Sequence, residues 1–435
     1  MNPNQLVQNP FFQEIENPIL TRSQNSDLYT ILSQGHGYLN IFGECGTGKT
    51  TILKALGKID VKPIGGLGEL SQLTQFICLY IDCKTSVISQ SPDTFWNVIF
   101  KELDRKLKDK NLNLVDLTDL TTVERSNKGL ELIIQSLAQE NKHLLLALDE
   151  FEGLIPQGEA LRQQTRTFLT ELRGLTNHEP SAILVIGTRC GLEKLWEPFA
   201  DPGGSSEFPN NSQRFLLGLW KEAEFQAFLE RSQVNGQARF TRREMRFIEN
   251  LSGRHPGLTQ KAAKLLFSKR LDENTVNLTD SQFQEISEQF IVDAASTYKE
   301  IWRGMDEQER LVMTMIVLEN TQGEIPNARY LIENINQSLD QRIVNDLKGR
   351  HLLILKDINL STNKPFSELF TAWIVQEISQ EPPAVLQERL KLYGGIISQG
   401  NARSLQNTVK FFYENRAVVA EYAQKIIKLA IDLIK

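Results

Sequence analysis

The sequence predicts an α/β domain, with a parallel sheet covered by helices on both faces, followed by a mostly helical C-terminal part. Three observations lead to this fold class. Short apolar runs alternate with stretches of helical spacing over the first half of the chain, which is typical of a parallel sheet. A glycine-rich segment joins the first run to a helix. The second half keeps the helical spacing but has few such runs.

The apolar runs mark the strands of the sheet. They are continuous rather than alternating, as expected for strands that are buried on both faces. The four clear runs cover residues 38–42, 76–84, 143–150 and 181–189. A fifth strand-like run, residues 214–220, follows a loop rich in Gly, Pro, Ser and Asn. Helices are expected after the glycine-rich segment and from Pro92, a residue suited to a first helical turn.

The C-terminal part divides into three pieces. Helical spacing continues from Trp220 to about residue 290, with one break at residues 252–257. Two helical stretches, a ribbon-like segment and a further helix then follow to about residue 378, which is the outline of a winged helix. After the sequence Glu-Pro-Pro at 381–383, the remaining residues again have helical spacing.

Length, composition and charge exclude several classes of protein. With 435 residues, the chain is long enough for several cores. It is 40% hydrophobic and has a net charge of −6, so the surface as a whole does not favour tight, nonspecific binding of nucleic acid. We find no signal-peptide pattern and no apolar window of about 18 residues. We therefore expect a cytoplasmic protein that does not contact membranes.

The glycine-rich segment has the spacing of a phosphate-binding loop. Gly43 and Gly48 are separated by four residues and followed by Lys49 and Thr50. Glycines let the backbone curl so that its N–H groups point inward, and the following helix adds its positive end. Lys49 would reach the β- and γ-phosphates of ATP, and the Thr50 hydroxyl would bind Mg²⁺. The expected nucleotide-binding residues are Gly43, Glu44, Cys45, Gly46, Thr47, Gly48, Lys49, Thr50 and Thr51.

Two acidic residues end the strand at residues 143–150. Open α/β sheets bind ligands at the carboxyl ends of their strands, so we expect Asp149 and Glu150 on a strand adjacent to the phosphate loop. Asp149 would hold Mg²⁺ through water. Glu150 would orient or deprotonate an attacking water. Glu152 is the weaker candidate and is predicted to be a surface charge.

Two arginines are candidates for contacts with the phosphates. Arg189 ends the fourth strand and would bind the γ-phosphate in a forked geometry, with a salt bridge as the alternative. Arg214 follows the Gly- and Pro-rich loop and would serve a neighbouring subunit as an arginine finger, with a solvated surface arginine as the alternative.

Together with "NPFF" near the start and "SGRHPGL" at residues 252–258, these motifs resemble the STAND class of P-loop ATPases within the AAA+ assemblage. The likeness is to the bacterial branch found beside conflict and defence modules, and it covers roughly residues 8–378. It implies that Pro10 and Phe11 help to wall the adenine pocket, that Pro256 touches the base, and that Arg189 is the sensor arginine.

The chain also departs from that class. Plant-type and animal-type relatives carry an ADP-sensing histidine in the winged helix, whereas residues 364–373 contain none. The resemblance divides the chain into an N-terminal adenine-pocket segment (1–28), a P-loop ATPase core (29–215), an α-helical lid (216–297), a winged-helix domain (298–380) and a C-terminal helical segment (381–435).

Two functions compete on this evidence. In the first, the chain binds ATP, hydrolyses it slowly, and uses ATP or ADP to control its conformation and homo-oligomerisation in bacterial signalling or antiviral defence. Its C-terminal helices would contact an effector or sensor protein. A third reading, a scaffold that binds nucleotide without turnover, is disfavoured by the presence of Glu150.

In the second function, the chain is a DNA-handling ATPase of the initiator or transposon-regulator type. The helical stretch at residues 338–351 would then enter a DNA groove. Its cations Arg342, Lys348 and Arg350 would contact DNA. Because Asp340 and Asp346 lie on the same stretch, internal packing is the favoured interpretation of this helix.

Overall fold

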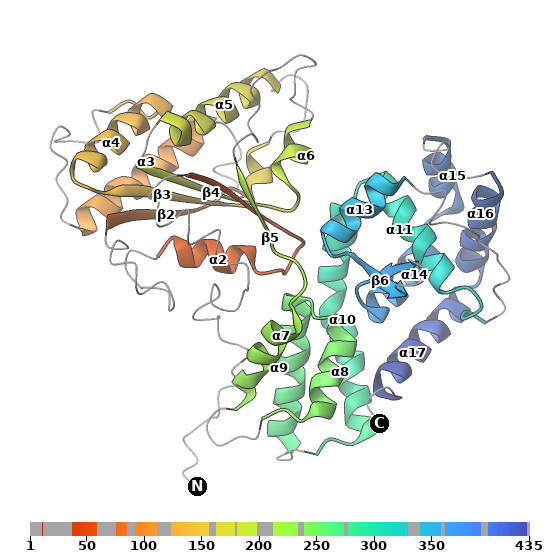
Figure 1. Ribbon diagram of the computed structural model, residues 1–435. Coiled ribbons are helices and arrows are strands. Elements are labelled where there is room, and N and C mark those ends of the chain that lie inside the picture. Colours follow the sequence, from red (N-terminus) through yellow and green to blue (C-terminus); the bar gives the residue numbers. More distant parts are fainter. Residues whose placement is uncertain are drawn as a thin grey trace, which may run out of the picture. The chain divides into compact units, whose positions relative to one another are not determined.

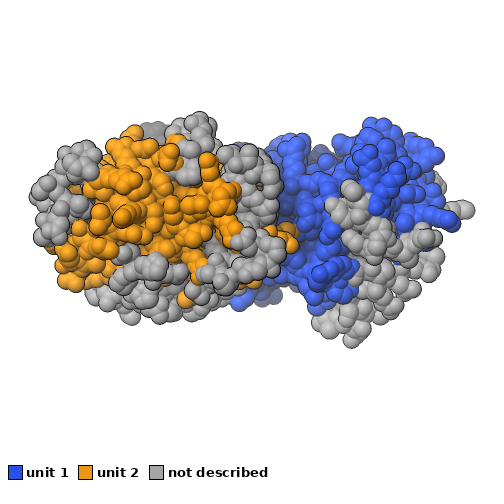
Figure 2. All heavy atoms as spheres, turned by 90° about the horizontal axis from the view of Figure 1, so that it is seen from above, with its two compact units in different colours: residues 1–13, 44–47, 218–435 blue, residues 14–43, 48–217 orange. Residues whose placement is uncertain are grey.

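The structure is a computed structural model of the chain (Figure 1). It describes residues 11, 37–58, 75–84, 92–110, 123–155, 162–178, 181–197, 212–233, 239–273, 277–326, 328, 340–357, 362–392 and 399–432. The chain forms two compact units, shown in two colours in Figure 2. Unit 2 comprises residues 14–43 and 48–217, and unit 1 comprises residues 1–13, 44–47 and 218–435. None of the helices described is both long and apolar enough to span a membrane.

Unit 2 contains a five-stranded sheet in which every pair of neighbours is parallel. The strands are β1 (Gly37–Phe42), β2 (Phe76–Asp82), β3 (His143–Asp149), β4 (Ala182–Thr188) and β5 (Gln213–Leu216). They lie in the order β2-β3-β4-β1-β5. All five fall at the predicted apolar runs, so the expected α/β fold class is confirmed. Because the strands are parallel, their carboxyl ends share one edge of the sheet.

Helices cover both faces of this sheet (Figure 1). They are α2 (Lys49–Leu56), α3 (Pro92–Asp109), α4 (Asn127–Gln139), the 3₁₀ helix η4 (Phe151–Leu154), α5 (Arg162–His178) and α6 (Leu192–Trp196). Alternate strand residues point to opposite faces. Leu145 and Ala147 pack with Leu53 of α2, whereas Leu144 and Leu146 belong to the core that α3, α4 and α5 complete.

Unit 1 begins with the helices of the predicted lid. They are α7 (Glu222–Leu229), the 3₁₀ helix η7 (Glu230–Ser232), α8 (Arg242–Ser252), α9 (Pro256–Glu273) and α10 (Asp280–Gly304). The predicted break lies between α8 and α9, where Gly253 adopts a left-handed φ of 58° that favours glycine. A single helix, α10, runs through the predicted boundary at residues 297/298.

A helix–ribbon segment, residues 307–380, follows in unit 1. Its elements are α11 (Glu307–Asn320), α13 (Gln341–Gly349), the antiparallel strands β6 (Leu353–Asp357) and β7 (Thr362–Pro365), and α14 (Glu368–Gln380). This order is consistent with the predicted winged helix. The chain ends in α15 (Pro383–Leu392), α16 (Gln399–Glu414) and α17 (Arg416–Asp432). On α17, Val419, Tyr422 and Ile426 are buried on one face as predicted, and Leu433 lies outside the described residues.

Candidate nucleotide site

The lysine end of the phosphate loop belongs to unit 2. Helix α2 begins at Lys49, and Gly48 before it has a left-handed φ of 100° that a side chain would strain. The buried Lys49 side chain donates from Nζ to the Gly43 carbonyl oxygen at 2.6 Å. The Gly43 N–H donates to the Thr188 carbonyl oxygen at 3.2 Å, which ties the loop to the end of β4. Thr50 lies in the first turn of α2. All residues of this helix are described, and its first turn has no acidic side chain.

The middle of the loop, residues 44–47, belongs to unit 1. The backbone N–H and the hydroxyl of Thr47 donate to the Glu44 carbonyl oxygen at 3.3 and 2.9 Å, which closes a turn. Gly46 has a φ of 78°, and its carbonyl oxygen accepts from the Gly257 N–H at 2.9 Å. A Cβ atom at Gly46 would lie 3.0 Å from His255, so both the backbone angle and the close approach favour glycine here.

Asp149 ends strand β3 and is 1% exposed. Its Oδ2 accepts from the Tyr80 hydroxyl at 3.0 Å, and its Oδ1 accepts from the Glu150 N–H at 3.0 Å. Burial raises the pKa of Tyr80, and the charge of Asp149 raises this pKa further. Tyr80 therefore remains a phenol that donates to the carboxylate.

The register of the sheet places Asp149 at the same edge as the start of the phosphate loop. Leu148 lies opposite Ile186 of β4, and Thr188 of β4 lies opposite Phe42 of β1. Strand β4 therefore separates β3 from β1, and the prediction that the carboxylates lie on a strand adjacent to the loop was wrong in this detail. Neighbouring strands are about 4.8 Å apart. The ends of β3 and β1, with β4 between them, are therefore about two strand spacings apart at this edge.

Glu150 follows Asp149 in a left-handed conformation, with a φ of 48°. Such a backbone costs roughly 1–2 kcal/mol for a residue with a Cβ atom, and residues held this way cluster at functional sites. The half-exposed Glu150 carboxylate lies 3.7 Å from Lys84 Nζ and 3.9 Å from an Arg189 guanidinium nitrogen. The expected base is thus held at the strand end beside Arg189.

Arg189 and Glu152 also meet at this edge. The Arg189 backbone N–H donates to Glu152 Oε1, and burial raises the pKa of the Glu152 carboxyl. The prediction that Glu152 is a surface charge was therefore wrong, because its carboxylate accepts a hydrogen bond from the backbone directly after β4. The Arg189 side chain forms the salt bridge to Glu150 that was the alternative interpretation, and its contact with a γ-phosphate stays a prediction.

Asn40 is a structural part of the site that sequence analysis missed. It is fully buried in β1, and its amide donates to the Thr188 hydroxyl at 2.8 Å and to the Ile186 carbonyl oxygen at 3.1 Å. Its Oδ1 accepts from the Leu192 N–H at 3.3 Å. The signal was present in the sequence, because Asn40 is the single polar residue within the apolar run of the first strand.

The remaining predicted residues lie in different parts of the fold. Pro256 is buried at the start of α9. Phe11 is buried against the rings of Phe228 and Phe240, with ring centroids 5.4 and 5.6 Å apart. Pro10 lies outside the described residues. The roles of these residues at adenine stay predictions.

Two cationic candidates have other neighbours. The Arg214 guanidinium lies 5.1 Å from the centre of the Phe42 ring and 3.7 Å from a Glu193 oxygen, and its role as an arginine finger stays a prediction. Arg350, directly after α13, is 6% exposed and bound to carboxylates. The favoured interpretation, internal packing, therefore holds for Arg350, and the alternative that this residue contacts DNA was wrong.

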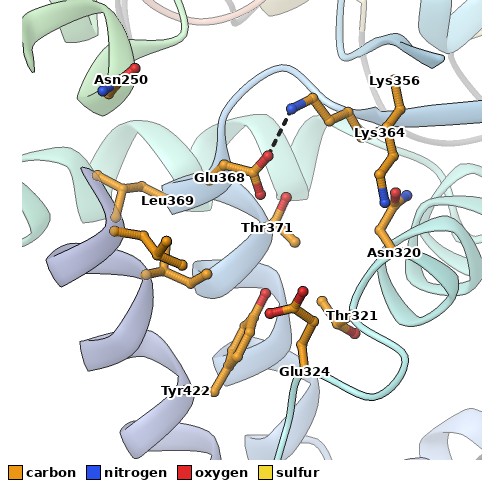
Figure 3. A pocket seen from close by; sticks show the side chains of 12 residues that line it. Asn250, Asn320, Thr321, Glu324, Lys356, Lys364, Glu368, Leu369, Thr371 and Tyr422 are labelled. Atoms are coloured by element: carbon orange, nitrogen blue, oxygen red, sulfur yellow. Dashed lines mark hydrogen bonds and ion pairs between the residues drawn. The ribbon is translucent and has the colours of Figure 1, made fainter. Parts of the chain in front are cut away.

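A separate pocket lies among the C-terminal helices of unit 1 (Figure 3). It has a volume of about 390 Å³ and is lined by α14, α17 and the β6–β7 ribbon, among other segments. Its rim carries the Lys364–Glu368 ion pair at 2.8 Å, and Tyr422 lines it from α17. None of the predicted nucleotide-binding residues lines this pocket.

Comparison with known proteins agrees with this fold. A family described as "AAA domain" matches residues 32–196. The Walker-type ATPase of Pyrococcus abyssi is similar in structure, with 14% identity and a TM-score of 0.52 over 84% of this chain and 99% of that one. The ORC2 protein of Aeropyrum pernix, in complexes with ADPNP and ADP, has 13% identity and a TM-score of 0.50 over 96% and 98% of the two chains. No match was found among curated protein sequences. Residues 32–196 are therefore similar to an AAA domain, and the chain shares the P-loop ATPase fold of these two structures.

Proposed function

We propose that this chain is an ATP-binding and slowly hydrolysing switch whose nucleotide state controls its conformation and its assembly into homo-oligomers. The observation that supports this most strongly is the shared edge of the parallel sheet. Lys49 follows β1 there, while Asp149 and Glu150 end β3 at the same edge. A cation for phosphate, a buried carboxylate and a half-exposed carboxylate are the groups that phosphoryl transfer to water requires.

The described residues fit magnesium and a polyphosphate. The loop has left-handed glycines at positions 46 and 48, and the first turn of α2 has no acidic side chain, so its N–H groups favour an anion. Thr50 and Asp149 are the residues that would hold Mg²⁺, which would neutralise phosphate charge when bound. Lys49 would exchange the Gly43 carbonyl oxygen for phosphate oxygens. Glu150 would take or orient the proton of the attacking water.

The way the loop is divided between the two units supports the proposed switch. Its middle residues, Glu44 to Thr47, make their contacts within unit 1, which also contains the predicted lid and the helix–ribbon segment. A nucleotide that moves these residues therefore acts directly on unit 1. We further propose that ATP exposes an oligomerisation surface, that Arg214 completes a neighbouring subunit's site, and that the C-terminal helices contact an effector or sensor protein. A cytoplasmic role in bacterial signalling or antiviral defence is the setting we propose.

The molar mass of the assembly tests this function. Light scattering on the purified chain with ATP, with ADP and without nucleotide should show a larger mass with ATP. A steady-state assay for phosphate release should show slow, magnesium-dependent turnover. A mass that does not change with nucleotide, together with fast and unregulated hydrolysis, would contradict the switch and leave an ordinary ATPase.

DNA handling is the second candidate, because the fold is shared with the ORC2 protein and because unit 2 has a cationic groove of about 590 Å³ along the edge strand β2. Its cations outnumber its acids: the charged residues lining it are Lys54, Lys58, Arg105, Lys106, Lys110, Glu102 and Asp109. Helix α13 supports this candidate less, since Arg350 is buried and Arg342 pairs with Asp340.

Binding to duplex DNA at several salt concentrations separates the two candidates. Nanomolar affinity at physiological salt, weakened by replacing Lys58 and Lys106 with glutamate but not by Arg342→Gln, would favour DNA handling at the groove. ATP-dependent oligomers without such affinity would favour the switch.

A further inference from the structure

Arg350 connects the helix–ribbon segment to the phosphate loop. It follows α13, and its Nε and Nη2 lie 2.7 and 2.6 Å from Glu44 Oε1. Its Nη1 lies 2.8 Å from Glu309 Oε1 and 3.2 Å from Asp346 Oδ2. The Arg350 guanidinium thus forms ion pairs with three carboxylates. The side chains of Arg350 and Glu44 are only 5% and 4% exposed.

Glu44 is an acidic residue in a loop that is expected to bind an anion. It directly follows Gly43, in the loop whose backbone N–H groups are expected to bind a polyphosphate. A carboxylate buried in an anion-binding loop costs solvation, and its charge repels phosphate unless a cation neutralises it. Arg350 supplies such a cation, since its guanidinium contacts this carboxylate.

The arginine is fixed in this position by α11. Glu309 uses one carboxylate oxygen to bind Arg350, and the other accepts from the Asp306 N–H at 3.0 Å as part of a capping box. Burial alone would lower the pKa of Arg350, but its three carboxylate neighbours outweigh burial and raise it, so the guanidinium stays charged. The start of α11 therefore orients Glu309, which holds Arg350 on Glu44.

The next residue makes a second contact of the same kind. His351 has a left-handed φ of 59°, and its Nδ1 accepts from the Leu219 N–H at 3.1 Å. A Cβ atom at Gly218 would overlap the His351 ring. Gly218 and Glu44 both begin stretches of unit 1 that continue directly from unit 2 in the sequence. Arg350 thus contacts Glu44, and His351 contacts Leu219, at or next to the first residues of two stretches of unit 1.

We propose that Arg350 is a positioning residue for nucleotide. By neutralising and holding Glu44, it makes the affinity of the phosphate loop for nucleotide depend on the helix–ribbon segment. The inference rests on the proposed function, in that the nucleotide must bind at this loop. Because coupling between two sites is reciprocal, bound nucleotide in turn stabilises the arrangement in which Arg350 and Glu44 are paired.

A double-mutant cycle on nucleotide affinity tests the proposal in the full-length chain. Titration with a fluorescent ADP analogue should show binding weakened about tenfold or more in Arg350→Gln, because the Glu44 carboxylate loses the buried guanidinium that offsets its charge. Glu44→Gln should bind within about threefold of the wild type, since Arg350 keeps two other carboxylates. The double variant should recover to within about threefold of the wild type.

Three comparisons exclude a merely structural effect. Arg342→Gln changes an exposed arginine of α13, the helix that Arg350 follows, and should leave affinity unchanged. Arg350→Lys keeps the charge and should retain more affinity than Arg350→Gln. If Arg350→Gln failed because the helix–ribbon segment unfolds around Glu309, the double variant would fail equally, and thermal melting of both would show it.

The outcomes separate this inference from the proposed function. A wild-type chain that binds no nucleotide contradicts the proposed function itself. A wild-type chain that binds nucleotide, combined with normal affinity in Arg350→Gln or no recovery in the double variant, overturns the role of Arg350 alone. Recovery in the double variant, with a defect in Arg350→Gln only, supports it.

Discussion

The two ends of the phosphate loop are held in different ways. Lys49 contacts Gly43, six residues away, and both belong to the sheet-based unit. Glu44, one residue after Gly43, contacts Arg350, which is 306 residues away and belongs to the helical unit. The difference teaches that the chemistry of this loop is encoded locally, whereas its connection to the rest of the chain depends on the folded structure.

The lysine end is expected to give the largest effect. Lys49→Ala removes the buried cation that would face the β- and γ-phosphates, so we expect no measurable nucleotide binding by calorimetric titration. Lys54→Ala, an exposed lysine near the end of the same helix, is the matched control and should bind normally. Unchanged nucleotide affinity in the Lys49 variant would contradict the account, because the lysine end of the loop would then not contribute to nucleotide binding.

Glu150, at the same edge of the sheet, should affect the rate of hydrolysis rather than the binding of ATP. Glu150→Gln keeps the size of the side chain and removes the base, so turnover should fall by about 10²- to 10⁴-fold while ATP still binds. Single-turnover phosphate release measures the rate. Glu140→Gln, which changes an exposed glutamate of the same unit, should hydrolyse normally. Normal hydrolysis by the Glu150 variant would remove this residue from the mechanism.

A second buried arginine in the helical unit, Arg270, provides a comparison with Arg350. Arg270 binds both carboxylate oxygens of Glu244, at 2.7 and 2.8 Å, and both side chains are about 3% exposed. Arg270→Gln should therefore lower the free energy of unfolding of unit 1 by about 3–5 kcal/mol, measured by denaturant titration. Its folded fraction should keep wild-type nucleotide affinity, unlike Arg350→Gln. Equal loss of affinity in the two variants would mean that any buried ion pair of this unit affects the loop.

The smallest expected effect depends on pH. Burial raises the pKa of Glu152, so the folded state favours its protonated form. The stability that this group contributes is fully present below the ordinary glutamate pKa of about 4.3 and is lost as pH rises through the raised value. Glu152→Gln keeps the acceptor for the Arg189 N–H and should raise the melting temperature slightly at pH 7, with less gain near pH 4. A larger gain at the acidic pH would contradict this assignment.

Local patterns predicted much of the fold and of the site. The five strands, the loop and the carboxylates at the end of β3 depend on runs and spacings within a few residues, so one sequence is enough to find them. Strand order is not local, and the insertion of β4 between β1 and β3 is visible only in the folded sheet.

Long-range contacts account for what the sequence did not show. Internal packing was the favoured interpretation of the stretch that contains Arg350, but its partners Glu44 and Glu309 are far away in the chain and could not be identified. Glu152 was interpreted as a surface charge because nothing near it in sequence indicates that it accepts from the Arg189 N–H. A charged residue can be assigned from sequence when its partner is near, as with Lys49, and not when folding brings the partner from another segment.

A structure of the chain with a non-hydrolysable ATP analogue and Mg²⁺ tests the nucleotide site most directly. Our account predicts triphosphate within the loop at residues 43–50, with Lys49 Nζ moved from the Gly43 carbonyl oxygen to a β- or γ-phosphate oxygen. It also predicts Mg²⁺ between Thr50 and Asp149. An analogue bound elsewhere, or a Lys49 that stays on Gly43 while the phosphates lie away from Asp149, would contradict it.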